Sequence, residues 1–155
     1  MHCGGVGRAT GRGAASLRAA PAPPRQQAAP APVLLLPSER AQVEAVLLRS
    51  QPELAPRVDA LFREYARFLA LKLALEPAPV TPCKAVDAVW HSHLLCTRAY
   101  AALCARENKG AMIHHEPGIG SEESYAETLA AYESAFGEPP PRSVWGRAKV
   151  AQAGV

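Results

Sequence analysis

The sequence predicts an all-α domain, a small bundle of about four helices preceded by a disordered N-terminal tail. Three observations support this prediction. Apolar residues recur at three- and four-residue spacing in four stretches of the 155-residue chain, as they do on the buried face of an amphipathic helix. No stretch shows the alternation of apolar and polar residues that is typical of a half-buried strand. Proline and glycine separate the four stretches, where helices are expected to end.

The first 36 residues are mostly Ala, Pro, Gly and Arg, with few large side chains. Such a segment cannot bury enough apolar surface to offset the entropy lost on ordering. We therefore expect residues 1–36 to form a disordered tail and residues 147–155 to form a disordered C-terminal end. The segment between them, residues 38–146, has the size of one small domain, which can be stable without disulfides.

The tail carries four arginines and no acidic residue, a composition shared with mitochondrial and plastid transit peptides. It has few hydroxyl residues and little amphipathic character. Two interpretations therefore stay open: a transit peptide that directs the protein to a plastid or mitochondrion, or a biased tail on a cytoplasmic protein. The chain has four cysteines but no CxxC pair and no secretory h-region near its start, so we expect an intracellular location with free thiols.

The charge distribution argues against nucleic acid as a partner. The formal net charge is +3, from 17 basic and 14 acidic residues, but four of the basic residues are arginines of the tail. The remainder has 13 basic and 14 acidic residues, a net charge of −1, and shows no basic cluster with interleaved aromatics. No apolar run approaches the roughly 18 residues of a membrane span. A protein partner is compatible with this composition, but no feature identifies one.

The first two helices follow the tail. Ser38 is expected to cap a short helix that runs to about Arg49 and is interrupted at Pro52. A longer helix is predicted from about Pro56 to Leu75, because seven apolar residues recur there at helical spacing. Two prolines within residues 76–79 should end it, since proline disfavours helix in the residue before it.

A third helix should begin at Thr81, as its N-cap, with Pro82 in the first helical position. It is expected to continue to about Arg106, where an Asn-Lys-Gly sequence at residues 108–110 ends it. The third helix is thus predicted to be continuous over more than twenty residues.

Ser121 can cap a fourth helix, whose first turn carries two glutamates favoured by the helix dipole. Gly137 occupies the place of a left-handed C-cap. After three consecutive prolines, Trp145 is expected to pack back on the bundle. This arrangement completes a bundle-like or orthogonal all-α domain.

Four of the five histidines fall within 25 residues, in a Trp-His-Ser-His motif at residues 90–93 and a His-His pair at residues 114–115. Imidazole is the side chain best suited to bind a transition metal or to move a proton near neutral pH. This cluster is therefore where we expect chemistry.

His91 and His93 diverge by about 200° around a helix and cannot both face one site there. His93 lies on one stripe with Tyr100 and Cys104, and apolar neighbours predict that this stripe is buried. Two interpretations stay open for His93: a core histidine satisfied by one hydrogen bond, or a ligand. A catalytic thiolate at Cys104 is a weaker alternative, because a cysteine deep in a helix among aromatics is usually an inert packing residue.

His91 shares a different stripe with Asp87, at i and i+4. The carboxylate can accept from one ring nitrogen, fix the tautomer and leave the other nitrogen free as ligand or base. The alternative is a surface pair that contributes a few tenths of a kcal/mol. His114 and His115 lie in a loop that can fold back over the third helix, and neighbouring residues of an extended chain point oppositely, so one of the two is expected to face inward.

Two or three imidazoles with Cys104 would suit Zn²⁺ or another borderline divalent metal. The expected ligands are His91, His114 and His115, followed by His93 and Cys104. The residues expected to support them are Asp87, Trp90 and Tyr100. A shared ion requires ring nitrogens of His91 and of His114 or His115 within about 4 Å of each other.

The segment from Tyr65 to Trp145 resembles the glycine-rich domain-containing protein-like family, whose domain has no established activity. The resemblance covers slightly more than half of the chain and follows a V-D-x-x-W-H-x-H-[IL]-L core, then Y-x-x-x-C and H-H-x-P. It implies that the cluster is a shared site of the family, made of Asp87, Trp90, His91, His93, Tyr100, Cys104, His114 and His115. Cys83 and Cys96 stand where the family usually has serine and aspartate. Plant members add glycine-rich and RNA-binding-like segments that this chain lacks, so the resemblance implies no RNA partner.

Three functions compete on these observations. The favoured one is a small helical domain that binds a divalent metal, zinc first, through the histidine cluster. The second is a metal-free protein-interaction module whose histidines form a buried polar network that fixes helix packing. The third is a hydrolase or a metal-dependent oxygenase that uses His91 with Asp87.

Overall fold

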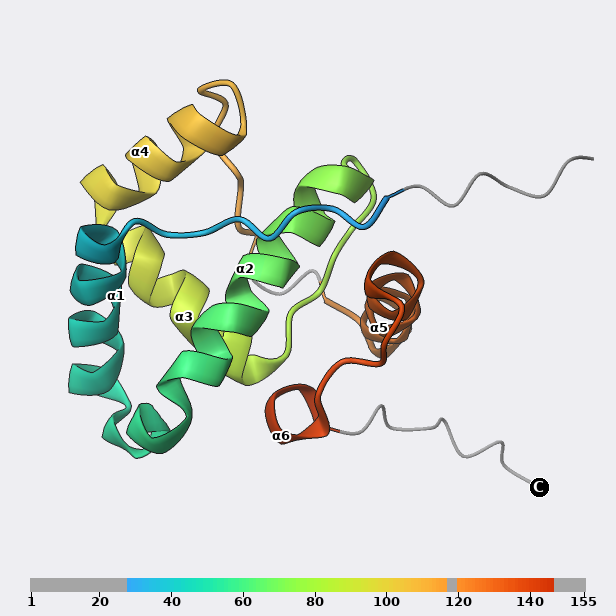
Figure 1. Ribbon diagram of the computed structural model, residues 1–155, viewed down its shortest axis with the longest axis horizontal. Helices are drawn as coiled ribbons and strands as arrows, with labels where there is room; N and C mark the ends of the chain where they lie inside the picture. Colours follow the sequence, from blue (N-terminus) through green and yellow to red (C-terminus); the bar gives the residue numbers. More distant parts are fainter. Residues whose placement is uncertain (1–27, 117–119, 147–155) are drawn as a thin grey trace, which may run out of the picture.

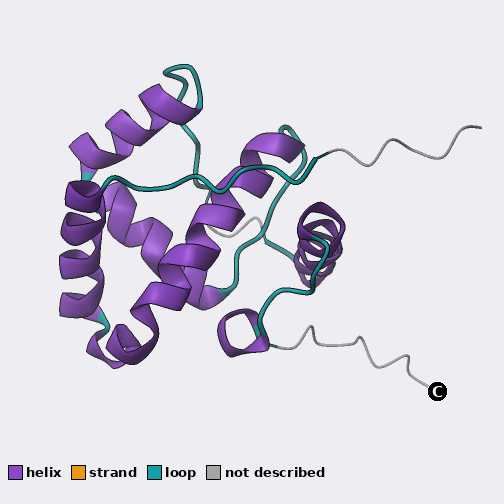
Figure 2. Ribbon diagram, in the orientation of Figure 1, coloured by secondary structure: helices purple, strands orange, loops and turns teal. Residues whose placement is uncertain are grey.

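The computed structural model describes residues 28–116 and 120–146. These residues form six α-helices and one 3-10 helix, and no strand (Figures 1 and 2). The all-α prediction is therefore confirmed, with a larger number of helices than the four expected. The elements are α1 (Pro37–Ser50), η1 (Pro52–Arg57), α2 (Val58–Leu75), α3 (Lys84–Leu95), α4 (Thr97–Glu107), α5 (Glu122–Phe136) and α6 (Arg142–Trp145).

The two central helices are α2 and α3, with α1 and α4 on one side and α5 and α6 on the other (Figure 1). α3 packs against both α1 and α2, and α2 also contacts α5 and α6. The buried face of α2 carries Leu61, Tyr65, Phe68 and Leu69, each with no measurable exposure. Burial of side chains of this size contributes roughly 1.5–3 kcal/mol each, so α2 supplies the main part of the core.

The N-terminal segment differs from the prediction. Residues 28–36 belong to the structure and cross α2 in extended conformation, whereas the sequence predicts that all of residues 1–36 lie outside the fold (Figure 1). Val33 is buried, and its backbone N–H donates to the carbonyl of Ala66 at 3.0 Å. Val33 and Leu35 give this segment apolar surface that packs against the core, whereas Leu34 and Leu36 are exposed. The expected disorder of residues 1–27 and 147–155 lies outside the described residues.

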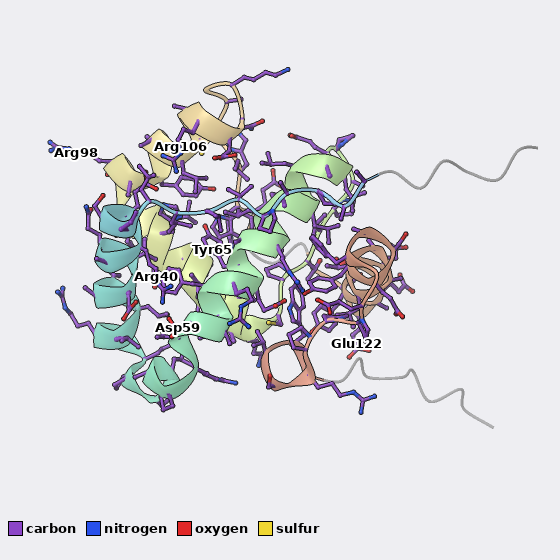
Figure 3. The ribbon with its side chains drawn as sticks, viewed as in Figure 1. Arg40, Asp59, Tyr65, Arg98, Arg106 and Glu122 are labelled. Atoms are coloured by element: carbon purple, nitrogen blue, oxygen red, sulfur yellow. The ribbon has the colours of Figure 1, made fainter. Side chains whose placement is uncertain are left out.

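The first helix begins with Pro37, so the prediction that Ser38 caps it is wrong. Leu36 is the N-cap residue, and the carboxylate of Glu39 in the first turn accepts from its backbone N–H at 2.9 Å. The same carboxylate binds both terminal nitrogens of Arg106 on α4, at 2.8 and 2.9 Å (Figure 3). This hydrogen-bonded arginine is the main reason that the pKa of Glu39 is lowered. The pair ties α4 to the start of α1.

The predicted third helix is divided in two. It begins at Lys84, not after Thr81, and it ends at Leu95. Cys96 takes φ −84° and ψ 61°, outside the helical region, and α4 starts again at Thr97. No proline or glycine marks this break, which is why the apolar spacing alone predicted one continuous helix to Arg106.

Thr81 makes contacts other than the expected cap. Its backbone N–H donates to Thr128 Oγ1 at 2.9 Å, and its hydroxyl lies 2.8 Å from Ser124 Oγ. The segment before α3 is therefore fixed to α5 through hydroxyl groups. Pro82 still precedes the helix, but in the connecting segment and not in its first turn.

The predicted caps of the following helix are confirmed. The backbone N–H of Ser124 donates to Ser121 Oγ at 3.1 Å at the start of α5, and Gly137 has φ 72° at its end. Trp145 packs back on the bundle as expected, because its Nε1 donates to the buried carboxylate of Glu64 at 2.8 Å. Among the described residues, no helix combines the length and the apolar character needed to cross a membrane.

Candidate metal centre

Three potential ligand atoms converge between α3 and the loop that follows α4. His91 Nε2 lies 3.0 Å from His115 Nε2, which in turn lies 2.9 Å from Asp87 Oδ1. The second carboxylate oxygen of Asp87 lies 3.6 Å from His91 Nε2. All three residues can place one ligand atom within 4.8 Å of the others. The distance between the two ring nitrogens meets the condition of about 4 Å that a shared ion requires.

The local sequence explains how two of these residues meet. Asp87 and His91 are four residues apart on α3, so their side chains lie one turn apart on the same face. His115 comes from the opposite direction, in the extended loop after α4. Its side chain is 11% exposed, whereas that of His91 is 54% exposed. The site is therefore half-buried on the His115 side and open to solvent on the His91 side.

His115 is held in place by its contact with Trp90 and by a chain of buried hydrogen bonds. Trp90 Nε1 donates to the hydroxyl of Tyr100 at 3.0 Å, and this hydroxyl donates to the backbone carbonyl of Ile113. The Trp90 ring meets the His115 ring edge-on, with centroids 4.3 Å apart. Burial raises the pKa of Tyr100 to about 12, so its hydroxyl remains a donor at neutral pH. The loop is thus fixed to both α3 and α4 at Ile113, two residues before His115.

The polar atoms at the centre need a hydrogen-bond donor or a cation between them. A carboxylate oxygen only accepts hydrogen bonds, and each neutral imidazole has one ring nitrogen that only accepts. A single proton shared between Asp87, His91 and His115 would meet this need, and so would a cation. Ligand atoms around a tetrahedral Zn²⁺ with bonds of about 2.0–2.1 Å are separated by roughly 3.3 Å. The separations from His115 Nε2 to His91 Nε2 and to Asp87 Oδ1, 3.0 and 2.9 Å, are slightly shorter than that value, and one ligand atom from each residue lies within 4.8 Å of the others.

The three residues line a pocket of about 560 Å³. Its other walls come from the end of α2, the segment before α3 and the loop around Ile113. Most of these walls are apolar, formed by Leu73, Pro77, Pro79, Val80, Trp90 and Ile113. The candidate ligands therefore face a space large enough for a small organic molecule.

His93 is placed apart from this group. Its side chain is completely buried, its Nδ1 lies 3.0 Å from the hydroxyl of Tyr65, and its Nε2 has no hydrogen-bond partner. Tyr65 lies on α2 at the centre of the molecule (Figure 3). Desolvation lowers the pKa of His93 to about 4, so this imidazole is neutral at physiological pH. The structure thus favours the first interpretation of His93, a core histidine with one hydrogen bond.

Cys104 and His114 also lie outside the group of converging atoms. Cys104 is buried, and its Sγ lies 3.7 Å from the Sδ of Met112. His114 is exposed and lines the pocket, while its neighbour His115 faces inward, as expected for adjacent residues of an extended chain. Cys83 and Cys96 are free thiols, and desolvation raises the pKa of both. Neither thiol has a cation among the described residues that would activate it as a thiolate.

Sequence reasoning assigned Asp87 to a supporting role, but its carboxylate stands at ligand distance itself. The i, i+4 spacing with His91 was a sufficient signal for this role. Sequence reasoning also did not identify Lys72, which lines the pocket with its ammonium group 5.5 Å from the centre of the Trp90 ring. The signal for Lys72 is weak, because one lysine near the end of an amphipathic helix is common.

Comparisons of the chain with models of protein families, with curated proteins and with solved structures find no match. What the site can do is therefore argued from its geometry.

Proposed function

We propose that this domain binds one divalent transition-metal ion, with zinc favoured, through Asp87, His91 and His115. The observation that carries the proposal is the convergence of one carboxylate oxygen and two imidazole nitrogens within 4.8 Å. Imidazole and carboxylate are ligands that zinc accepts at about 2.0–2.2 Å. The charges also fit, since one carboxylate and two neutral imidazoles leave a divalent ion with a net charge of +1.

Three protein ligands make the site resemble catalytic zinc sites more than structural ones. Structural zinc sites are closed by four protein ligands, whereas catalytic sites keep a position for water or substrate. The exposed side of His91 and the pocket beside it leave room for such a position. Two histidines and one carboxylate are also the ligand set of many non-haem Fe²⁺ centres, so iron is the second metal to test.

The contacts around the ligands support this proposal. Metal-binding histidines are usually oriented by a second group, and such groups typically change metal affinity 10- to 100-fold. Here the Trp90 ring packs against the His115 ring, and the Trp90–Tyr100–Ile113 chain fixes the loop. These are interactions that would hold His115 in place before an ion binds.

We also propose that the domain belongs to the glycine-rich domain-containing protein-like family. The V-D-x-x-W-H-x-H motif supplies Asp87 and His91, and the H-H-x-P motif supplies His115. If the metal proposal holds for this chain, family members with both motifs should bind metal through the same three positions.

The test is metal binding by the purified full chain. We expect one equivalent of Zn²⁺ by elemental analysis and by calorimetric titration, and a higher melting temperature when the ion is added. His91→Ala and His115→Ala each remove a ligand and should lower the affinity by about 100-fold or more.

The matched control is His114→Ala, which removes the neighbouring exposed histidine and should leave the affinity within about twofold. The proposal is wrong if the protein binds no stoichiometric Zn²⁺, Fe²⁺ or Cu²⁺ and gains no thermal stability from them. It is also wrong if His114→Ala lowers the affinity as much as His115→Ala.

A further inference from the structure

Lys72 is a charged group of the pocket that forms no ion pair with a carboxylate of the described residues. Its side chain is half-buried at the end of α2, and it lines the same pocket as the three candidate ligands. Within residues 28–116 and 120–146, no carboxylate lies within 4.0 Å of its ammonium group. Among these residues, the ammonium contacts the face of the Trp90 ring. An ammonium group in a pocket is stabilised by an anion that accepts a charge-assisted hydrogen bond, so Lys72 indicates where an anionic group of a ligand would lie.

Trp90 connects Lys72 to the metal centre. The ammonium lies 5.5 Å from the centre of the indole ring, and the His115 ring centre lies 4.3 Å from it. These two distances place the ammonium within about 10 Å of the His115 ring. Lys72 and the three candidate ligands line the same pocket of about 560 Å³, so one small molecule in it can reach both the open side of the metal centre and Lys72.

The remaining charged groups of the pocket are exposed. Lys84, Glu76 and Glu116 line it, but water surrounds them and screens their charge. With a divalent ion bound, the formal charges of all lining residues and the ion sum to +1. A ligand with one negative charge would neutralise the site.

The apolar walls favour an organic acid over an inorganic anion as the ligand. Two prolines, Leu73 and the Trp90 ring surround the space next to Lys72, and an inorganic phosphate would leave this surface uncovered. An organic acid would place its carboxylate between the ion and Lys72 and its hydrocarbon part against the apolar walls.

We infer that this pocket binds a small organic acid, whose carboxylate lies between the open position of the metal ion and the ammonium group of Lys72. The inference rests on the proposed metal site and goes beyond it in naming the class of ligand. The three protein ligands hold the ion, and Lys72 selects for an anionic group beside it.

The experiment uses the full chain loaded with Co²⁺, whose visible absorption reports its ligands. Benzoate serves as the probe acid and inorganic phosphate as the competing anion. We expect benzoate to change the Co²⁺ spectrum saturably without removing the ion. Lys72→Gln should weaken benzoate binding about tenfold and leave the Co²⁺ affinity unchanged, because it removes a charge-assisted contact to the acid and none to the ion. Lys72→Arg, which keeps the charge, should retain most of the binding.

Lys84→Gln is the matched control, since it removes an exposed lysine from the same pocket and should change benzoate binding less than about twofold. The inference is overturned if benzoate leaves the spectrum unchanged, if Lys72→Gln binds it as tightly as the unmodified chain, or if phosphate binds more tightly than benzoate. Failure of the metal proposal is seen separately, as the absence of a Co²⁺ spectrum before any acid is added, and it overturns both.

Discussion

His91 and His93 stand two residues apart on α3, yet their rings face opposite surroundings. The His93 ring is completely buried and contacts the rings of Tyr65 and Tyr100 edge-on. The His91 side chain is 54% exposed and points its Nε2 at the carboxylate of Asp87 and the ring of His115. One short motif therefore contributes a core residue on one face of the helix and a candidate metal ligand on the other.

The difference between the two faces lies in what surrounds each ring. The His93 ring contacts the rings of Tyr65 and Tyr100, and burial favours the neutral imidazole. Around His91 the neighbours are a carboxylate, a second imidazole and a pocket open to solvent. A histidine can bind an ion only where other ligands converge and an ion can enter. The surroundings of His91 meet both conditions, and those of His93 meet neither. The idea of a buried polar network thus fits His93, while metal binding fits His91.

The largest expected effect is a difference in the free energy of unfolding between alanine variants of the two histidines. His93→Ala should lower the free energy of unfolding of the metal-free protein by about 4 kcal/mol, because it opens a cavity in the core and leaves the hydroxyl of Tyr65 unpaired. His91→Ala should change it by less than about 0.5 kcal/mol, since that side chain is exposed. Urea denaturation of both variants measures the two values. Equal losses for the two variants would remove the distinction between the faces.

The next effect concerns pH. The pKa of His93 is about 4 in the folded chain and about 6.5 when it is unfolded, so folding favours the neutral ring. The stability that comes from this preference is fully present above about pH 6.5. It is lost as the pH falls towards 4, because the unfolded chain then binds a proton that the folded chain does not. Between about pH 7 and pH 4.5 this amounts to roughly 2–3 kcal/mol.

Denaturation of the metal-free chain at several pH values measures this loss, with His93→Gln as the control that lacks the titrating ring. The charged groups nearest to His93 are Glu39 and Arg106, and they remain paired through most of this range because the pKa of Glu39 is lowered. An unchanged pH dependence in His93→Gln would show that another group is responsible.

The smallest of the three effects tests the connection between the faces. Tyr100→Phe removes the hydroxyl that accepts from Trp90 and donates to the carbonyl of Ile113. Two buried polar groups lose their partner, which should cost about 2 kcal/mol of stability. Because this chain of bonds fixes the loop before His115, the affinity for Zn²⁺ should fall about tenfold as well.

Tyr125→Phe is the matched control, because the Tyr125 hydroxyl also donates to a backbone carbonyl, that of Trp145, but neither residue lines the pocket of the proposed metal centre. It should reduce stability by about 1 kcal/mol and leave the affinity for Zn²⁺ unchanged. If both variants lose affinity equally, the effect comes from general destabilisation and not from the position of His115.

Several parts of the fold could be predicted because their signals are local. The apolar spacing of α2, the hydroxyl cap at Ser121 and the left-handed Gly137 are encoded within a few residues of the element they define. The break at Cys96 could not be predicted, because no proline or glycine marks it in the sequence. Nor could the packing of residues 28–36, where the apolar end of a tail-like segment crosses α2.

The candidate site likewise has one part that could be predicted from the sequence and one part that could not. The pairing of Asp87 with His91 follows from helical spacing, and the opposite directions of His114 and His115 follow from extended chain. That His115 and not His114 meets this pair depends on Trp90, Tyr100 and the carbonyl of Ile113, which come together through contacts between separate elements.

By itself, the sequence determined the helical class, the pairing of Asp87 with His91 and the separation of His91 from His93, since each depends on the fixed rotation of residues along a helix. Only the tertiary structure decided which loop histidine completes the group and that an ammonium from α2 stands beside it. The physical reason is that His115 lies 24 residues from His91 and 28 from Asp87 along the chain, so long-range packing, not local conformation, brings their atoms together. Packing between α2 and α3 likewise places the Lys72 ammonium 5.5 Å from the centre of the Trp90 ring.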